Sequence, residues 1–292
     1  MKIAVASGKG GTGKTTVATS LALSLVSQCA VQYLDCDVEA PNGHLFLKPD
    51  FNQHIEAVIQ VPQIDQNLCS ACGKCVEVCQ FHALARIGKK ILVFPQLCHG
   101  CGSCTWNCPE GAIREIPNPI GVLESGITND QIQFSRGLLT ISEPMPTPII
   151  RQLKNLSKPS EGTITILDAP PGASCSVVET LRGADFALLV TEPTPFGLHD
   201  LNQMLGIVTE MNIPAGIIIN RENDPFKPLS EFCEKNQLPV LMRIPYERKI
   251  AEGVAKGQTL VEIYPDYLLQ FQHVFNQIVA FVRQGLQPER GF

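Results

Sequence analysis

The sequence lacks any uninterrupted apolar run that approaches the roughly 18 residues a helix needs to cross a bilayer. No basic segment followed by an apolar one precedes the first predicted strand, Ile3 to Ala6, so an export signal is not expected. The net charge of -5 gives no basic field for a polyanion, so nucleic acid is not an expected partner. We therefore predict a cytoplasmic protein.

The carboxy-terminal stretch Tyr267 to Arg283 also lacks a lysine cluster, although apolar residues recur in it at helical spacing. Without such a cluster an amphipathic helix has no anchor for anionic lipid. We predict a core helix here and no membrane association.

Cysteine, in contrast, is abundant, with twelve among 292 residues. Disulfides are rare in the cytoplasm, where clustered cysteines indicate metal binding or catalysis. A chain of this length can bury a substantial core and has room for about two domains.

The amino-terminal residues contain the most specific motif. The predicted strand Ile3 to Ala6 is followed by G-K-G-G-T-G-K-T at residues 8–15, which satisfies G-x-x-x-x-G-K-[ST] at every position. Glycines allow positive φ, so that consecutive N–H groups can face a phosphate chain, and the next predicted helix adds its dipole. Lys14 supplies a charge to the β and γ phosphates, and the Thr15 hydroxyl can bind Mg²⁺. The predicted nucleotide-binding residues of this stretch are Gly8, Lys9, Gly10, Gly11, Thr12, Gly13, Lys14, Thr15 and Thr16.

Carboxylates follow two later predicted strands. Asp35 and Asp37 come directly after the second strand, and Asp168 ends a later one that continues as A-P-P-G to Gly172. Carboxylates at such strand ends, beside a phosphate loop, can hold Mg²⁺ and orient a water molecule. A solvated loop with capping aspartates is the alternative for residues 35–37. We predict Asp35 and Asp168 as magnesium residues and Asp168 to Gly172 as a switch that responds to the γ-phosphate.

Two more predicted strands end in residues that suit a nucleotide base. Asn220 and Arg221 follow Ala215 to Ile219, and Pro245 follows Val240 to Ile244. A side-chain amide offers both a donor and an acceptor, as an adenine edge requires. We predict Asn220, Arg221 and Pro245 as nucleotide-binding residues.

From about Val61 to Pro117 the strand and helix periods vanish and cysteines appear at fixed spacing. The run C-x₂-C-x₂-C-x₃-C occurs twice, as an internal duplication. This spacing resembles that of bacterial two-cluster ferredoxins, in which the fourth cysteine of each run binds the other cluster. The resemblance implies one 4Fe-4S cluster on Cys69, Cys72, Cys75 and Cys108, and a second on Cys98, Cys101, Cys104 and Cys79.

Zinc is the competing metal, although zinc sites favour ligands in two separated pairs. One departure from the ferredoxin pattern is Gln80, where a proline is usual and where the second run has Pro109. We expect only a local change in the loop after Cys79. We also predict that Trp106, between two cysteines, covers a cluster from solvent.

Together these motifs resemble the MinD/ParA/Mrp class of P-loop ATPases, in the subgroup with an inserted ferredoxin domain, over nearly the whole chain. The resemblance is carried by the deviant Walker A run at residues 9–15, by Asp35-x-Asp37, by Asp168 to Gly172 and by the eight cysteines. It implies an α/β fold of the SIMIBI type, with a mostly parallel sheet and helices on both faces, plus a small inserted α+β ferredoxin domain. The implied boundaries are 1–60 and 118–292 for the ATPase and 61–117 for the insertion.

The same resemblance implies roles for particular residues. ATP binding would form a nucleotide-sandwich homodimer in which Lys9 reaches the partner's ATP. Asp37 would position the attacking water, Thr15 would bind Mg²⁺ with Asp35 and Asp168 in support, and Asn220 would contact adenine. A second cation beside the phosphates stabilises charge that develops on the γ-phosphoryl group, whereas a solvated surface lysine is the alternative for Lys9. The predicted catalytic residues are Lys9, Lys14 and Asp37.

Cys175 lies seven residues after Asp168, directly after the predicted switch. The nitrogenase iron protein, a relative of the class, has a cluster-binding cysteine at a comparable spacing. We hypothesise that Cys175 faces the dimer axis and binds an added cluster or contacts a metal cargo. The alternative is a small buried residue, which is the stronger interpretation for Cys29, Cys36 and Cys233.

The predicted function is that of an ATPase whose nucleotide-driven dimer switch is coupled to electron transfer through two 4Fe-4S clusters. Its expected cofactors are ATP, Mg²⁺ and the clusters, and its expected partner is a redox or metal-cofactor client protein. One alternative is an ATP-dependent scaffold or carrier for iron-sulfur or other metal cofactors. Another is a MinD-like positioning switch whose clusters sense redox state.

Overall fold

The computed structural model describes residues 1–156 and 158–285. Its main sheet contains β1 (Lys2–Ala6), β2 (Val31–Asp35), β3 (Asp50–Ile64), β6 (Ile113–Ile127), β7 (Gln133–Leu139), β8 (Ile164–Asp168), β9 (Phe186–Thr191), β10 (Ala215–Glu222) and β11 (Val240–Pro245). The strand order is β11-β10-β9-β1-β8-β2-β7-β6-β3. Strands β11 to β7 are parallel, whereas β6 and β3 pair antiparallel. The predicted α/β class with a mostly parallel sheet is confirmed.

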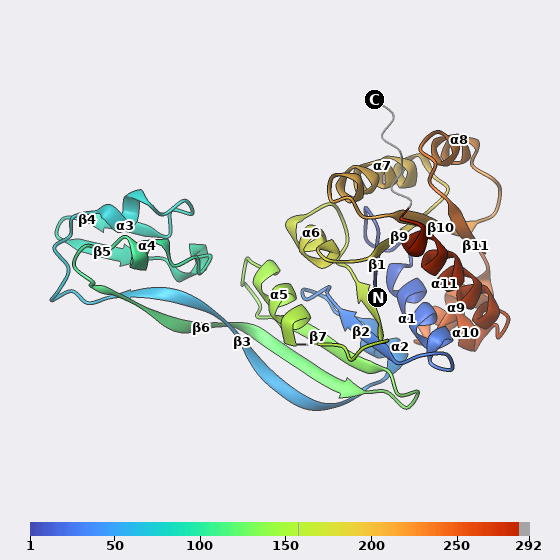
Figure 1. Ribbon diagram of the computed structural model, residues 1–292, viewed down its shortest axis with the longest axis horizontal. Helices are drawn as coiled ribbons and strands as arrows, with labels where there is room; N and C mark the ends of the chain where they lie inside the picture. Colours follow the sequence, from blue (N-terminus) through green and yellow to red (C-terminus); the bar gives the residue numbers. More distant parts are fainter. Residues whose placement is uncertain (157, 286–292) are drawn as a thin grey trace.

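The central strands are buried because helices cover both faces of the sheet (Figure 1). Every residue of β2, β8 and β9 is buried, as expected for apolar parallel strands between two helical layers. One layer contains α1 (Lys14–Leu25), α10 (Leu260–Ile263) and α11 (Tyr267–Gln284). The other contains α5 (Thr147–Leu156), α6 (Cys175–Leu181), α7 (Pro195–Glu210) and α8 (Lys227–Lys235). Short helices α2 (Gly43–Leu47) and α9 (Arg248–Ala255) pack on the α1 side, where α2 contacts α1 and α9 contacts α10.

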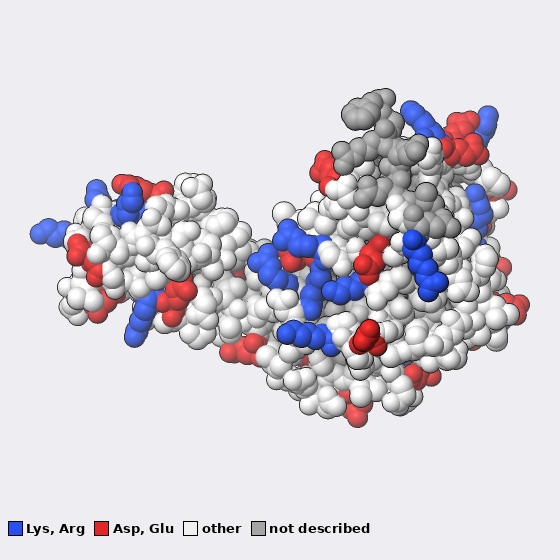
Figure 2. Space-filling view, in the orientation of Figure 1, with Lys and Arg blue, Asp and Glu red and all other residues white. Residues whose placement is uncertain are grey.

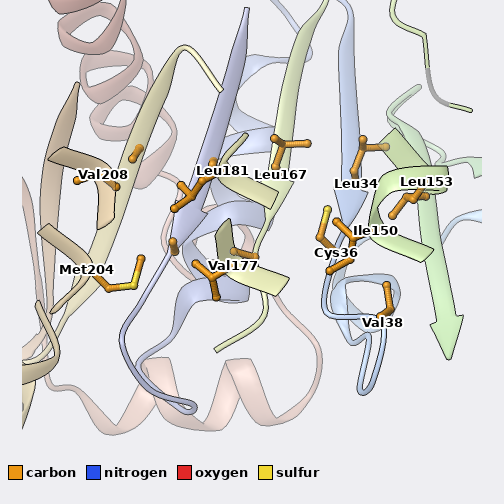
Figure 3. Packing of buried hydrophobic residues seen from close by; sticks show 14 of the residues in the cluster. Leu34, Cys36, Val38, Ile150, Leu153, Leu167, Val177, Leu181, Met204 and Val208 are labelled. Atoms are coloured by element: carbon orange, nitrogen blue, oxygen red, sulfur yellow. The ribbon is translucent and has the colours of Figure 1, made fainter. Parts of the chain in front are cut away.

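Helices α5 and α6 are packed firmly on the sheet. Figure 3 shows Ile150 and Leu153 of α5 beside Leu34 of β2, and Val177 and Leu181 of α6 pointing into the same core. These side chains are at most 2% exposed. A single leucine-to-alanine change in such a core costs about 2–5 kcal/mol, so the position of both helices is strongly fixed.

Helix α11 is the core helix that the sequence predicts. Its Phe271, Val274 and Ile278 are at most 1% exposed and pack in the core layer that contains α1. Within the described ranges, no helix has both the length and the apolar character that a bilayer crossing requires.

Strands β3 and β6 are each 15 residues long and extend past the rest of the sheet as a two-stranded ribbon (Figure 1). Their pairing runs from Asp50 opposite Ile127 to Ile64 opposite Ile113, whereas β7 pairs with β6 only as far as Gly121. We call residues 65–112, at the outer end of the ribbon, the insert. The boundaries expected at residues 61 and 117 fall within this ribbon.

The insert contains β4 (Leu84–Ile87), β5 (Lys90–Val93), α3 (Lys74–Glu77), a 3₁₀ turn (Pro95–Leu97) and α4 (Ser103–Trp106). Its backbone shows the duplication that the sequence predicts. Positive φ angles occur in pairs 29 residues apart, at Ala71 and Gly100, Gly73 and Gly102, and His82 and Gly111. Glycine adopts this conformation without strain, and the second copy has glycine at all three positions.

The loop after Cys79 keeps the geometry of its counterpart despite Gln80. The His82 N–H donates to the Cys79 carbonyl, and the Gly111 N–H donates to the Cys108 carbonyl, both over 3.3 Å. Proline at this position is therefore not required for the turn.

Candidate nucleotide and metal sites

The phosphate loop connects β1 to α1 and is bonded to the predicted switch. Gly11 and Gly13 have φ angles of 80° and 91°, and a Cβ on Gly13 would collide with the side-chain amide of Asn220. The Gly172 N–H donates to the Ser7 carbonyl over 3.1 Å, so the loop after β8 contacts the phosphate loop directly. Because of this hydrogen bond, a movement of either loop would displace the other.

Side chains of the phosphate loop point inward. Lys14 is only 8% exposed, and Thr12 is 3% exposed. Within the described residues the Thr12 hydroxyl oxygen is buried and has no hydrogen-bond partner. A buried hydroxyl without a partner is costly, so a ligand that bonded it would gain from the arrangement.

The predicted magnesium carboxylates lie side by side. Asp35 and Asp168 are opposite one another in β2 and β8, and neither is exposed to solvent. Asp35 accepts hydrogen bonds from the N–H groups of Gly43 (2.8 Å) and Asp37 (3.3 Å). Asp168 Oδ2 accepts one from the Tyr33 hydroxyl (2.8 Å), whereas its buried Oδ1 has no partner in the described ranges.

Burial controls the ionisation of these groups. It raises the pKa of Asp35 to about 8, and repulsion from Asp168 adds to the rise. Burial also raises the pKa of Asp168, against the attraction of Lys14. For Asp37, burial raises the pKa to about 6, with Lys14 again opposing. Crowded carboxylates that resist joint ionisation are a site that a divalent cation would neutralise.

Lys9 is held by a carboxylate of its own chain. Its Nζ lies 3.1 Å from Glu192 Oε2, and Arg221 donates to Glu192 Oε1 over 2.6 Å. Glu192 is 12% exposed, whereas the Lys9 and Arg221 side chains are 38% and 50% exposed. One carboxylate therefore joins the phosphate loop to the strand end at which the base was expected.

A pocket lies beside Gly13 and Thr16, and it brings Asn220, Arg221 and Pro245 together. Asn220 is buried, its amide donates to the Thr12 carbonyl over 2.7 Å, and its Oδ1 accepts from the Arg221 N–H over 3.0 Å. One amide hydrogen and one carbonyl lone pair remain for a ligand.

Sequence reasoning missed the rest of this pocket's wall. The additional lining residues are Val17, Ile244, Tyr246, Glu247, Ile250, Ala251, Val254 and Leu260. The apolar positions 250, 251 and 254 recur at helical spacing in α9, which is a signal that could have identified them. An apolar wall with few polar groups suits a flat heterocycle.

Cys175 is the first residue of α6 and is exposed, so the buried alternative for it is wrong. Gly172, three residues earlier, has a φ of 91°. Cys36 and Cys233 are buried, and burial raises the pKa of the Cys233 thiol to about 11, as expected for packed structural cysteines. Cys29 is partly buried.

The eight cysteines of the insert divide into two groups. One hollow is lined by Cys69, Cys72, Cys75 and Cys108, and another is lined by Cys79, Cys98, Cys101 and Cys104. Each group contains three cysteines of one run and the fourth of the other. In residues 1–156 and 158–285, no three His, Cys, Asp or Glu side chains are arranged to hold a single metal ion.

Backbone donors point at several of these sulfur atoms. The N–H groups of Ala83 and Ala112 lie 3.3 Å from the sulfurs of Cys79 and Cys108, at equivalent places in the two copies. Such bonds favour the thiolate form that binds metal. Trp106 does not cover a cysteine group as predicted, because it is 90% exposed.

The chain was compared with known proteins. It is 31% identical over 284 residues to an uncharacterized protein of Methanocaldococcus jannaschii, which covers 96% of this chain and 98% of the relative. It is 26% identical to an iron-sulfur cluster carrier protein of Aquifex aeolicus, with 95% of this chain and 67% of the relative covered. The cell division ATPase MinD of Pyrococcus furiosus has a similar structure, with a TM-score of 0.56, 19% identity and 95% and 98% of the two chains covered.

MinD of Pyrococcus horikoshii, solved with Mg-ADP, is also similar, with a TM-score of 0.58, 17% identity and 98% and 99% of the two chains covered. These structural likenesses show a shared fold. The family model for the CobQ/CobB/MinD/ParA nucleotide binding domain matches residues 3–261. The chain therefore belongs to the CobQ/CobB/MinD/ParA family of P-loop nucleotide-binding proteins.

Proposed function

We propose that this protein is an ATPase that couples a nucleotide-driven dimer switch to electron transfer through two 4Fe-4S clusters. The observation that supports it best is the division of the eight insert cysteines into two hollows, each lined by one complete four-cysteine set. This grouping is the one that two-cluster ferredoxins use.

The ATPase half of the proposal depends on residues around the phosphate loop. ATP would place its phosphates on the N–H groups of residues 8–16, with Lys14 on the β and γ phosphates and the base beside Asn220. Mg²⁺ fits the buried carboxylate site, because Asp168 Oδ1 has no partner among the described residues and Thr15 lies in the first turn of α1. When bound, the ion neutralises phosphate charge. Asp37, partly exposed beside this site, would orient the attacking water.

The iron-sulfur half depends on the insert. Both hollows combine four cysteines with backbone donors to sulfur, and this chemistry fits a cubane better than a single zinc ion, whose four ligands must meet at one point. When bound, each cluster stores one electron. The chain's own contribution is to hold the sulfurs, donate hydrogen bonds to them and limit solvent access.

In the proposed cycle ATP binding forms a homodimer in which Lys9 leaves Glu192 and reaches the partner's nucleotide. Hydrolysis reverses this step, and the switch from Asp168 to Gly172 transmits the change through α6. The client is a redox protein. Cys175, exposed at the start of α6, is available to a dimer partner or a metal cargo.

A second candidate function is supported by the relatives. Three similar proteins, at 26% identity, are described as iron-sulfur cluster carriers. A carrier would transfer iron and sulfide to an apo-client and lose its own, whereas an electron-transfer protein would reduce the client and keep its clusters.

The deciding experiment is anaerobic purification with iron and sulfide analysis and EPR, repeated with ATP and with a non-hydrolysable analogue. About eight irons per chain and a nucleotide-dependent spectrum would support the proposal. Zinc, or no metal, at the eight thiols would overturn the iron-sulfur half. Eight irons with identical spectra would leave two independent modules, and cluster transfer to an apo-client would favour the carrier.

A further inference from the structure

The two-stranded sheet of the insert has one face against the cysteine groups. Leu84 of β4 and Ile91 of β5 are 4% and 3% exposed, and they pack in one cluster with Cys75 and Cys104. These two cysteines come from different groups. The thickness of one sheet therefore separates its opposite face from both proposed iron-sulfur sites.

That opposite, outer face carries apolar side chains in solvent. Ile87 and Leu92 are 63% and 40% exposed, and they alternate with the buried residues of their strands. Lys90 lies opposite Ile87, and Lys89 is at the tip of the hairpin. An apolar centre with a charged rim is the usual composition of a transient protein interface.

The insert also differs in net charge from the rest of the chain. The insert has four basic residues and three acidic ones, which give it a net charge of +1. Because the whole chain has a net charge of -5, the residues outside the insert have a net charge of -6. The basic residues are all between residues 74 and 90. Figure 2 shows basic side chains projecting from the outer end of the insert, with acidic ones between them.

Two of these basic groups lie next to the first cysteine group. Arg86 donates to the Ala71 carbonyl over 3.3 Å, in the loop between Cys69 and Cys72. Lys74 follows Gly73 in the lining of the same hollow, and its partner Glu77 is 3.7 Å away in an exposed pair that contributes little.

We propose that the outer face of β4 and β5, with Ile87 and Leu92 at its centre and Lys89 and Lys90 beside them, docks an acidic one-electron carrier protein. Lys89 and Lys90 attract an acidic partner to this face, and the apolar side chains between them and the strand centre hold it there. Each exchange moves one electron between the carrier's cofactor and the insert, and the oxidation of one balances the reduction of the other. This inference rests on the proposed function, because it requires the clusters.

The test uses the full chain, purified anaerobically, and an acidic flavodoxin as the probe. Iron content is measured first, and then the Kd for flavodoxin is measured by calorimetry at low and high salt. The double variant Lys89→Glu, Lys90→Glu should weaken binding about tenfold at low salt, and Leu92→Gln should weaken it at both salt concentrations. The control Lys227→Glu, Arg248→Glu makes the same change in net charge at two body residues whose side chains are 85% and 91% exposed.

Normal iron content, weaker binding by the hairpin variant and near-normal binding by the body variant would support the inference. Equal weakening by both double variants, no binding of flavodoxin by the unaltered protein, or preferential binding of a basic cytochrome would overturn it. Each of these results, obtained with eight irons present, would leave the proposed function intact. A protein without iron would instead overturn the proposed function itself.

Discussion

The Gln152 side chain of α5 hydrogen-bonds to both the N–H and the carbonyl of Val58, at the place where the ribbon leaves the sheet. Its Oε1 accepts from the Val58 N–H over 3.3 Å, and its Nε2 donates to the Val58 carbonyl over 3.0 Å. The β3 to β6 register shifts between Ala57 and Val58, and Val58 lies opposite Pro119, which has no N–H to donate. Gln152 therefore replaces ladder bonds that the ribbon cannot make.

The same helix is tied to the switch side of the molecule. Arg151 donates to the Glu179 carboxylate of α6 over 3.2 Å, and Lys154 donates to three carbonyls at the end of α6, over 2.6 to 3.0 Å. On the other side of Val58, Ile59 and Val61 belong to the same apolar cluster as Cys98 of the insert. A continuous path of packed groups thus connects the segment after Gly172 with one cysteine group.

Replacing Gln152 with alanine should uncouple the two halves of the molecule. The change leaves two backbone groups of Val58 without their partner, so stability should fall by about 1–3 kcal/mol. We expect near-normal ATP hydrolysis and iron content, but an EPR spectrum that no longer changes with ATP. Gln203→Ala on α7, an exposed glutamine whose amide bonds His199 on the same helix, is the matched control and should keep the response. If the EPR spectrum of Gln152→Ala still changed with ATP, α5 would not be the route by which the nucleotide affects the clusters.

Replacing single cysteines with serine should show which cysteines bind the same cluster, and we expect the crossed pattern in which the fourth cysteine of each run binds with the other run. Because Cys108 lines the hollow of the first group and Cys79 that of the second, Cys108→Ser should lose the same EPR signal as Cys72→Ser. Cys79→Ser should instead match Cys101→Ser, and each variant should retain about four of eight irons. Cys29→Ser, away from the insert, should retain all of them. Pairing of Cys79→Ser with Cys72→Ser would contradict the crossed assignment.

Replacing each of the two lysines of the phosphate loop with alanine should impair a different step of the ATPase reaction. Lys14 is buried beneath the loop, so Lys14→Ala should abolish ATP binding measured with a fluorescent analogue. Lys9 is partly exposed and is bonded to Glu192 in the single chain. Lys9→Ala should therefore bind ATP almost normally but hydrolyse it about 10³-fold more slowly, as removal of an arginine finger does. Equal loss of binding by both variants would remove the case for a separate role of Lys9.

Much of the site was predictable because its signals are local. Asp35 and Asp168 end buried apolar runs, and the parallel sheet places such ends at one edge. The resemblance of the cysteine runs to two-cluster ferredoxins likewise implied the two groups that the structure brings together. The positions of Gln152 and Tyr33 were not predictable, because each acts on a residue more than 90 positions away in the chain. The prediction that Trp106 covers a cluster was wrong, because a residue between two metal ligands in the sequence can still point outward.

Tyr33 should act as a positioning residue for magnesium. Its hydroxyl bonds Asp168 Oδ2, whereas Oδ1 has no hydrogen-bond partner within the part of the chain that the structure describes. Tyr33→Phe removes a hydrogen bond to a charged group, worth about 1.5–3 kcal/mol, so about tenfold or more Mg²⁺ should be needed for half-saturation. Mn²⁺ binding in the presence of ADP, followed by EPR, measures this without turnover. Tyr264→Phe, which removes a 2.7 Å bond to Glu247, is the control and should leave metal affinity unchanged.

Glu192 should oppose the dimer, because it holds Lys9 on its own chain. In the proposed dimer Lys9 must leave this carboxylate, and the cost of breaking such a partly exposed pair is about 0.2–1 kcal/mol. Glu192→Gln removes this cost from both chains, about 0.4–2 kcal/mol in all, so dimerisation with ATP should become about two- to thirtyfold tighter by analytical ultracentrifugation. Glu222→Gln is the matched control, since Glu222 is also 12% exposed and pairs with Arg243 at the end of the same sheet. Weaker dimerisation of Glu192→Gln alone would show instead that this carboxylate supports the closed state, by holding Lys9 or Arg221 within the interface.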